Sequence, residues 1–121
     1  MEVVSGDPTR KRGGERGPAG ATLAVYGPTG KRIVDLADAA EVVVGRAEPA
    51  TVVVDDPSLS RRHARFWRAD DGLFVEDLGS TNGTFVRGAR VDRAPLLDGY
   101  EVRLGDVLVV VSDTSSAGDG D

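Results

Sequence analysis

The feature that most constrains the fold is the alternation of short apolar runs with turn-forming residues across the middle of the chain. Between Thr22 and Ser112, runs rich in Val, Leu, Thr and aromatic residues recur about every eight to twelve residues. Asp-Gly and Asn-Gly pairs stand between them and supply the positive φ that tight turns require. No stretch sustains the apolar spacing of an amphipathic helix. The pattern therefore predicts an all-β fold.

The number of runs favours a two-sheet β-sandwich of about ten to eleven short, mainly antiparallel strands over a barrel. In a sandwich the loops gather at the two ends, and loops are where function normally lies. Strands are predicted at Thr22–Tyr26, Lys31–Leu36, Glu41–Gly45, Thr51–Val54, His63–Arg68, Leu73–Asp77, Thr84–Val86, Val91, Tyr100–Leu104 and Val107–Val111.

The chain of 121 residues is short enough for one domain, with a different composition at each end. Residues 1–21 are rich in Gly and Pro without apolar periodicity, so they are predicted to be a flexible N-terminal arm. Residues 22–112 are the predicted domain. Residues 113–121 are small or acidic and are predicted to be a flexible tail or the start of a linker, which leaves open a larger multidomain protein.

Composition excludes several classes of protein. The chain has no cysteine and one histidine, His63, so no disulfide framework, Cys nucleophile or ordinary zinc site is expected, and no cofactor is implied. No long apolar run or secretory segment occurs, so we expect a cytoplasmic protein without membrane insertion. The net charge is −5, and the folded part has no basic run longer than Arg61–Arg62. Nucleic acid is therefore not an expected partner.

Two local patterns suggest enzymes but fit them poorly. The segment Gly27–Lys31 resembles a phosphate loop, yet its glycines are too close together and Arg32 follows the lysine, so a hairpin turn is the better interpretation. Ser60 and His63 could form a nucleophile and base, but a hydrolase also needs an oxyanion hole and an orienting acid. His63 is better interpreted as a hydrogen-bonding brace for the preceding loop. No enzymatic activity is predicted.

Three segments at predicted strand ends contain side chains that together could bind a ligand. Residues 44–46, 60–64 and 77–84 together offer a strand-edge guanidinium, three hydroxyl groups and a side-chain amide. A sandwich can bring these segments together at one end. A guanidinium and hydroxyl groups suit a tetrahedral dianion such as a phosphate group, because they supply charge-assisted hydrogen bonds in several directions. These side chains suit the binding of such a ligand rather than catalysis.

The arrangement resembles the forkhead-associated (FHA) domain, a phosphothreonine-binding module with a sandwich of the SMAD-FHA type. The resemblance covers essentially all of 22–112 and implies the same fold. The segments that carry it are the turn Gly27-Pro28 to Gly30, the pair Gly45-Arg46, Asp56-Pro57, Ser60-Arg61, His63-Ala64, the block Asp77–Thr84, and the closing Leu97-Asp98-Gly99 and Leu104-Gly105-Asp106.

The resemblance implies a phosphothreonine-dependent protein–protein interaction module in signal transduction. It would recruit partners phosphorylated by Ser/Thr kinases, with a kinase or its substrates as the phosphothreonine-containing partner. It also implies a preference for phosphothreonine over phosphoserine and an influence of the third residue after it. The excess of arginine over lysine, together with many Ala, Gly and Val residues, favours a bacterial source.

The resemblance implies that Arg46 and Ser60 bind the phosphate group and that the hydroxyl of Thr81 completes the phosphate-binding set. Asn82 would fix the peptide backbone beside the phosphothreonine, and Arg61 would also touch the peptide. The residues that would shape the loops without contacting ligand are Gly45, His63 and Gly83.

Simpler roles for these residues stay open. Asn82 could be only a turn former, Thr81 and Ser80 could serve only local hydrogen bonds, and Arg46 could pair with a loop aspartate. The whole domain could also be a phosphate-independent interaction or oligomerisation module.

A phosphorylated Thr9 or Thr114 could alternatively occupy the domain's own site. Three positions depart from the usual family pattern, namely Thr51, Arg87 and Tyr100. Because of these departures, the resemblance does not imply a particular loop shape or a particular peptide preference.

Overall fold

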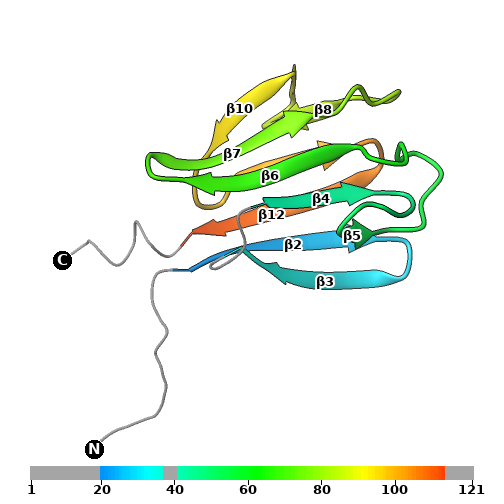
Figure 1. Cartoon of the computed structure of the whole chain (residues 1–121), viewed down its shortest axis with the longest axis horizontal. Coiled ribbons are helices and arrows are strands. Elements are labelled where there is room, and N and C mark those ends of the chain that lie inside the picture. The colour runs from blue at the N-terminus through cyan, green and yellow to red at the C-terminus, as the bar shows by residue number, and fades with distance from the viewer. Residues whose placement is uncertain (1–19, 37–40, 114–121) are drawn as a thin grey trace, which may run out of the picture.

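The computed structural model describes residues 20–36 and 41–113, and these form eleven strands in two sheets that pack face to face (Figure 1). The all-β prediction is confirmed. Thr9, Thr114 and most of the predicted arm and tail lie outside the described residues. The strands are β2 (Ala21–Gly27), β3 (Gly30–Asp35), β4 (Glu41–Gly45), β5 (Val52–Val53), β6 (Ala64–Ala69), β7 (Gly72–Asp77), β8 (Thr84–Val86), β9 (Ala89–Val91), β10 (Arg93–Leu96), β11 (Glu101–Leu104) and β12 (Val107–Asp113).

The two sheets have five and six strands. The smaller sheet has the order β10-β7-β6-β4-β5, and the larger one has the order β3-β2-β12-β11-β8-β9. Every pairing is antiparallel except that of β4 with β5, which is parallel. Two-residue turns close several hairpins, as between Gly27 and its partner Gly30. The predicted sandwich of mainly antiparallel strands is therefore confirmed.

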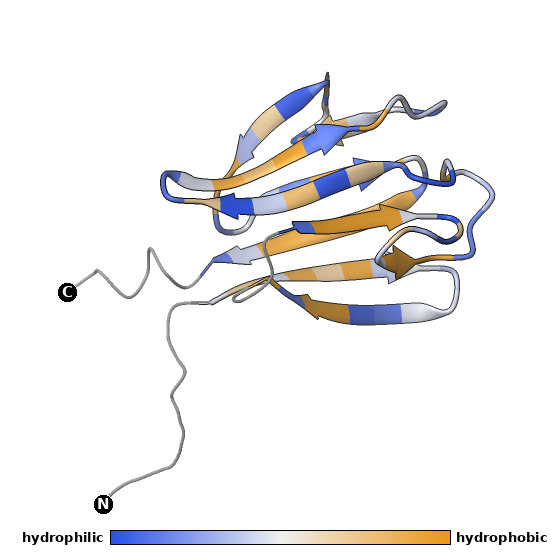
Figure 2. Ribbon diagram, viewed as in Figure 1, coloured by the Kyte–Doolittle hydropathy of each residue, from blue (hydrophilic) through white to orange (hydrophobic). Residues whose placement is uncertain are grey.

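The core lies between the sheets and is built by alternation along the strands. In β12 the even-numbered residues Leu108 and Val110 face outward, while Val109 and its odd-numbered neighbours are fully buried. Alternation of this kind is expected when a sheet has one face on a core and one face toward solvent. Figure 2 shows the exception, β4, which is apolar along most of its length because nearly all of it is buried.

Several predicted boundaries differ from the observed ones. Strand β5 contains only Val52 and Val53 and is shorter than predicted, and β6 begins at Ala64, so His63 lies just outside the strand. Strands β2 and β12 extend by one residue past the predicted domain boundaries.

Strand β10 was missed, because Arg93 and Pro95 interrupt its apolar pattern. It is an edge strand paired only with β7, which is where a sheet tolerates proline.

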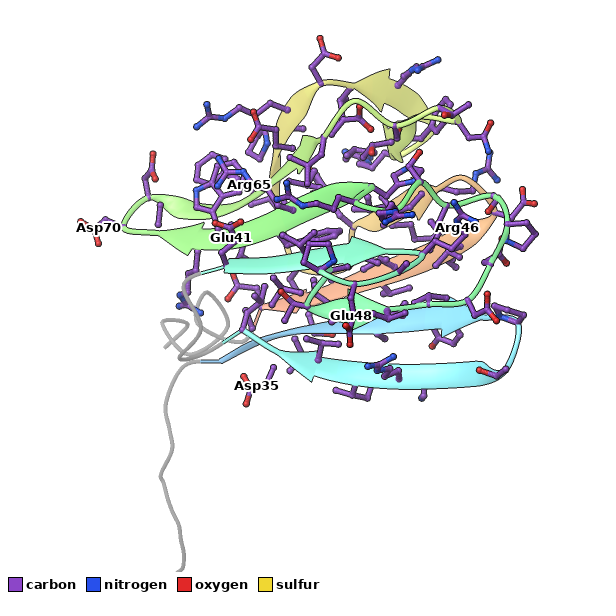
Figure 3. The ribbon with its side chains drawn as sticks, turned by 45° about the vertical axis from the view of Figure 1, so that its right-hand side comes forward. Asp35, Glu41, Arg46, Glu48, Arg65 and Asp70 are labelled. Carbon is purple, nitrogen blue, oxygen red and sulfur yellow. The ribbon has the colours of Figure 1, made fainter. Side chains whose placement is uncertain are left out.

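The sandwich gathers three connections at one end, between β4 and β5, between β5 and β6, and between β7 and β8. In Figure 3 Arg46 lies at this end, and Asp70, in the turn between β6 and β7, lies at the other. The connection from β7 to β8 crosses from one sheet to the other. The Asn82-Gly83 pair belongs to this crossing loop and not to a hairpin, although Gly83 has the expected positive φ of 93°.

Candidate phosphate-binding site

A hollow of about 390 Å³ opens between the three gathered loops. It contains all five residues assigned to phosphate or peptide, together with three that were not predicted. The lining residues are Arg46, Pro57, Ser58, Leu59, Ser60, Arg61, Thr81 and Asn82. Residues far apart in the sequence thus converge on one concave surface.

Gly45 sets the close approach that places Arg46 beside Ser60. The N–H of Arg46 donates to the carbonyl of Ser60 at 2.9 Å, so the end of β4 runs directly against the next loop. A Cβ atom at Gly45 would collide with the backbone of Arg61, and only glycine leaves room for this approach. The side chain of Arg46 is exposed. Within the described residues, Arg65 forms ion pairs and Arg46 forms none, which gives no support to a structural pairing with a loop aspartate.

His63 lies beneath the hollow and joins two of its loops. It is fully buried, and its Nδ1 accepts a hydrogen bond from the N–H of Ser60 at 3.1 Å. Its Nε2 lies 2.8 Å from the carbonyl of Gly83, so the ring is the neutral tautomer with the proton on Nε2. Both ring nitrogens are therefore occupied. His63 acts as a brace and has no free nitrogen with which to take a proton from Ser60.

The Ser60 hydroxyl is also tied to the third loop. Its Oγ accepts a hydrogen bond from the N–H of Thr81 at 3.0 Å. Accepting this bond leaves the hydroxyl proton of Ser60 available to donate. Thr81 is exposed and lines the same hollow.

Asp77 holds the crossing loop, and sequence analysis did not single it out. Its carboxylate accepts from the hydroxyl groups of Ser80 and Thr84 and from the N–H groups of Gly79 and Ser80. Burial alone would raise the pKa of Asp77, but these hydrogen bonds outweigh it and hold the pKa below its ordinary value. Ser80 also accepts from the N–H of Gly83, so its role is local.

Ser58 was missed as well, although it connects three segments. Its carbonyl accepts from the side-chain amide of Asn82 at 2.8 Å, and its Oγ accepts from the N–H of Asp106 at 2.8 Å. The hydroxyl and N–H of Ser58 donate to Asp56 and hold the pKa of that carboxyl below its ordinary value. The spacing of Asp56 and Ser58 is that of an Asx turn, which is the signal that could have identified Ser58.

The hollow has the chemistry of an anion site. Two arginine residues and three residues with hydroxyl groups, Ser58, Ser60 and Thr81, line it, and no carboxylate is among its lining residues. Within residues 20–36 and 41–113, no cluster of His, Asp and Glu could hold a metal ion. The arrangement can donate several hydrogen bonds to one anionic group.

Comparisons with known proteins agree with this geometry. The family model described as the FHA domain matches residues 42–105. The oxoglutarate dehydrogenase inhibitor of Corynebacterium diphtheriae is 36% identical over 113 residues, covering 91% of this chain and 78% of the inhibitor. The glycogen accumulation regulator GarA of Mycobacterium tuberculosis is 37% identical over 107 residues, covering 86% of this chain. The chain spans 65% of the length of that regulator.

Solved structures give the same result. A structure from a study of phosphothreonine-dependent FHA domain interactions superposes with a TM-score of 0.69 and 32% identity, covering 77% of this chain and 95% of that one. The FhaA FHA domain in complex with the intracellular domain of Rv3910 gives a TM-score of 0.67 and 33% identity over 75% of this chain and 98% of that one. The strand order, the converging loops and these matches show that the chain belongs to the FHA domain family.

Proposed function

We propose that this domain binds phosphothreonine in partner proteins and thereby recruits proteins phosphorylated by Ser/Thr kinases. The observation that carries the proposal is the convergence of Arg46, Ser60 and Thr81 on one exposed hollow without a carboxylate. A phosphate group there would receive a forked pair of bonds from the guanidinium and further bonds from the hydroxyl groups. Each bond to a charged group contributes about 1.5 to 3 kcal/mol.

The neighbouring residues are placed to hold the peptide itself. Asn82 donates one side-chain hydrogen bond to Ser58, and a side-chain amide has a second N–H and a carbonyl oxygen for a peptide backbone. Arg61 is exposed at the rim of the same hollow. We propose that Asn82 and Arg61 contact the residues beside the phosphothreonine.

The comparisons support a regulatory role rather than catalysis. Two of the relatives are a glycogen accumulation regulator and a dehydrogenase inhibitor, and one structural neighbour was solved in complex with the intracellular domain of another protein. The engaged ring of His63 leaves Ser60 without a base, so we propose that the domain has no enzymatic activity of its own. Within the part of the chain that the structure describes, no helix has the length and apolar character to cross a bilayer. A cytoplasmic location stays a prediction.

A library screen tests the proposal. Degenerate peptides that present phosphothreonine, phosphoserine or an unmodified residue at a fixed position would be screened against the wild-type protein and Arg46→Ala. We expect selective capture of phosphothreonine peptides by the wild type, and loss of this capture in the variant. No preference for phosphorylated peptides in the wild type would overturn the proposal, and a phosphate-independent interaction module would replace it.

A further inference from the structure

Strand β3 forms an edge of the six-stranded sheet, and among the described strands only β2 pairs with it. In Figure 1 it is the lowest strand of the molecule. The other three edges are short or interrupted, because β5 has two residues, β9 has three, and β10 contains Pro95, which lacks a backbone donor. Strand β3 has six residues, no proline, and a register with β2 that no bulge interrupts. It is therefore the edge best suited to pair with a further strand.

Three residues of β3 direct their backbone groups away from β2. Leu36, directly after the strand, donates its N–H to the carbonyl of Ala21 at 2.8 Å. Residues that bond to the neighbouring strand alternate with residues that do not, so the even-numbered residues of β3 bond to β2. The N–H and C=O groups of Lys31, Ile33 and Asp35 therefore point outward from the sheet edge.

The side chains of the same three residues share the outer face of the sheet. The buried residues of β2 are odd-numbered, and Ile33 and Lys31 lie opposite its even-numbered residues Ala24 and Tyr26. Ile33 is 58% exposed, although it is a large apolar residue, and Tyr26 beside it is also exposed. Lys31 and Asp35 are exposed, and Figure 3 shows Asp35 at the outer edge of the molecule.

This order of a basic, an apolar and an acidic side chain is complementary to itself when it is reversed. If a second copy pairs antiparallel with Ile33 opposite its own Ile33, each Lys31 lies opposite the Asp35 of the other copy. In this register all three outward-pointing backbone groups find partners, the exposed isoleucines meet, and opposite charges face each other.

Other antiparallel registers satisfy fewer of these groups. A shift of one residue sets the outward-pointing backbone groups opposite groups that already bond to β2. A shift of two residues sets Ile33 opposite Lys31 or Asp35, which leaves a charged side chain against an apolar one. The edge therefore specifies one register.

From these observations we propose that two copies of this chain dimerise by antiparallel pairing of their β3 strands, in the register centred on Ile33. The two six-stranded sheets then form one continuous sheet. The proposal does not depend on the proposed function, because no residue of β3 lines the phosphate-binding hollow.

The pairing has a consequence for binding. Strands β2 and β4 both end at the end of the sandwich that carries Arg46, and antiparallel pairing reverses one copy relative to the other. The two phosphate-binding sites therefore lie at opposite ends of the dimer. A partner with two phosphorylated threonines far enough apart gains affinity from binding both.

The dimer is expected to be weak. A strand of six residues offers less than the roughly 800 Å² per partner of a stable interface. Exposed ion pairs such as Lys31 with Asp35 contribute little affinity and mainly select the orientation. Association should therefore depend on concentration.

Sedimentation equilibrium of the full chain at concentrations up to about 1 mM tests the proposal. We expect the wild type to change from monomer to dimer within this range. Lys31→Asp and Asp35→Lys should each weaken association about tenfold or more, because like charges replace both ion pairs. Arg93→Asp, which makes the same charge change at the edge of the other sheet, is the control and should associate as the wild type does.

The charge variants can also be combined. The double variant Lys31→Asp/Asp35→Lys should regain the wild-type association, because each pair is again of opposite charge. A mixture of Lys31→Asp with Asp35→Lys should form a heterodimer, since one copy then has two acidic groups at the edge and the other has two basic ones. A loss of folding in either single variant does not produce this recovery.

A cysteine substitution tests the register directly. The chain has no cysteine, so Ile33→Cys introduces the only thiol. Directly opposite residues in a hydrogen-bonded pair have Cα atoms about 5.5 Å apart, which a disulfide can span. Ile33→Cys should therefore oxidise to a covalent dimer at least about tenfold faster than Leu97→Cys, whose position is equally exposed.

Four outcomes would overturn the proposal. They are a wild type that stays monomeric over the whole range, a dimer that Lys31→Asp and Arg93→Asp affect equally, no heterodimer in the mixture, and equal oxidation rates of the two cysteine variants. Phosphothreonine binding should be unchanged in every β3 variant. Its failure would instead appear in the screen of phosphorylated libraries.

Discussion

The two hollows of this domain both present arginine side chains, but they are held in different ways. The loops around Arg46 are fixed from below by buried His63 and half-buried Asp77, which form hydrogen bonds to backbone and side-chain groups of these loops. The second hollow, the Arg87 groove, is lined by Arg87, Leu97 and Tyr100 among others, and it is fixed at the surface by a hairpin turn and by stacking of Arg87 on Tyr100. The backbone N–H and C=O groups of irregular loops need hydrogen-bond partners from elsewhere in the fold, whereas those of regular strands are already paired with neighbouring strands.

This difference predicts how substitutions in each region affect folding and binding. At the Arg46 end, residues that never touch a ligand still set the shape of the hollow, so their loss affects both folding and binding. In the Arg87 groove, side chains can change with little cost to the fold.

Arg46→Ala should weaken binding of a phosphothreonine peptide by about a hundredfold or more, because it removes a forked pair of charge-assisted bonds. Stability should stay unchanged, since the side chain of Arg46 is exposed. Isothermal titration calorimetry measures the affinity and urea unfolding measures the stability. Arg93→Ala is the control and should bind as the wild type does. A loss of less than about tenfold would mean that Arg46 does not hold the phosphate.

Asp77→Asn should lower the free energy of unfolding by about 2 to 4 kcal/mol, because an amide cannot accept all the hydrogen bonds that the carboxylate accepts. It should also weaken phosphopeptide binding, since the loop of Thr81 loses its anchor. Urea unfolding measures the first effect. Asp71→Asn, in an exposed turn, should change stability by no more than about 0.5 kcal/mol. Equal stability of the two variants would refute the anchoring role.

Stability should fall at acid pH. The pKa of Asp77 is lowered in the folded protein, since hydrogen bonds outweigh the opposing effect of burial. The stabilisation is complete above the unfolded value, near 3.8, and is lost as the pH falls through the lower folded value.

Urea unfolding between about pH 5 and pH 2 measures this loss. Asp77→Asn should show a smaller fall but still some fall, because the pKa of Asp56 is lowered in the same direction by its bonds from Ser58. An identical pH dependence in the variant and the wild type would show that Asp77 is not the titrating group.

Arg87→Asn should change the free energy of unfolding by less than about 1 kcal/mol. Relief of backbone strain, about 1 to 2 kcal/mol, is largely offset by the loss of an exposed cation–π contact, about 0.5 to 1 kcal/mol. Urea unfolding measures the result. A large destabilisation would show that Arg87 supports the fold as Asp77 does, and the contrast between the two regions would fail.

Much of the fold could be predicted because turn residues and alternation are local signals. Strand β8 was placed with its observed bounds, since Gly83 and the Arg87-Gly88 turn flank a short apolar run. Strand β10 could not be predicted, because its place at the sheet edge depends on pairing with β7 and not on a pattern within its own sequence. The single parallel pair, β4 with β5, is likewise a tertiary feature.

The candidate site was predicted only in part. Arg46, Ser60 and Thr81 were assigned through a family resemblance, and the structure brings them to one hollow. Asp77 and Ser58 were missed, because their roles depend on hydrogen bonds between loops. Ser58 contacts residues 24 and 48 positions away, and no local pattern contains such contacts.

We expect the phosphate group of a partner to control binding at the Arg46 end. The most direct test is calorimetric titration of the wild-type protein with one selected peptide, phosphorylated on its threonine, and with its unmodified twin. We expect the phosphorylated form to bind at least about a hundredfold more tightly, because the phosphate receives two or three charge-assisted bonds. Equal affinity for the two peptides would show that the phosphate group does not control binding.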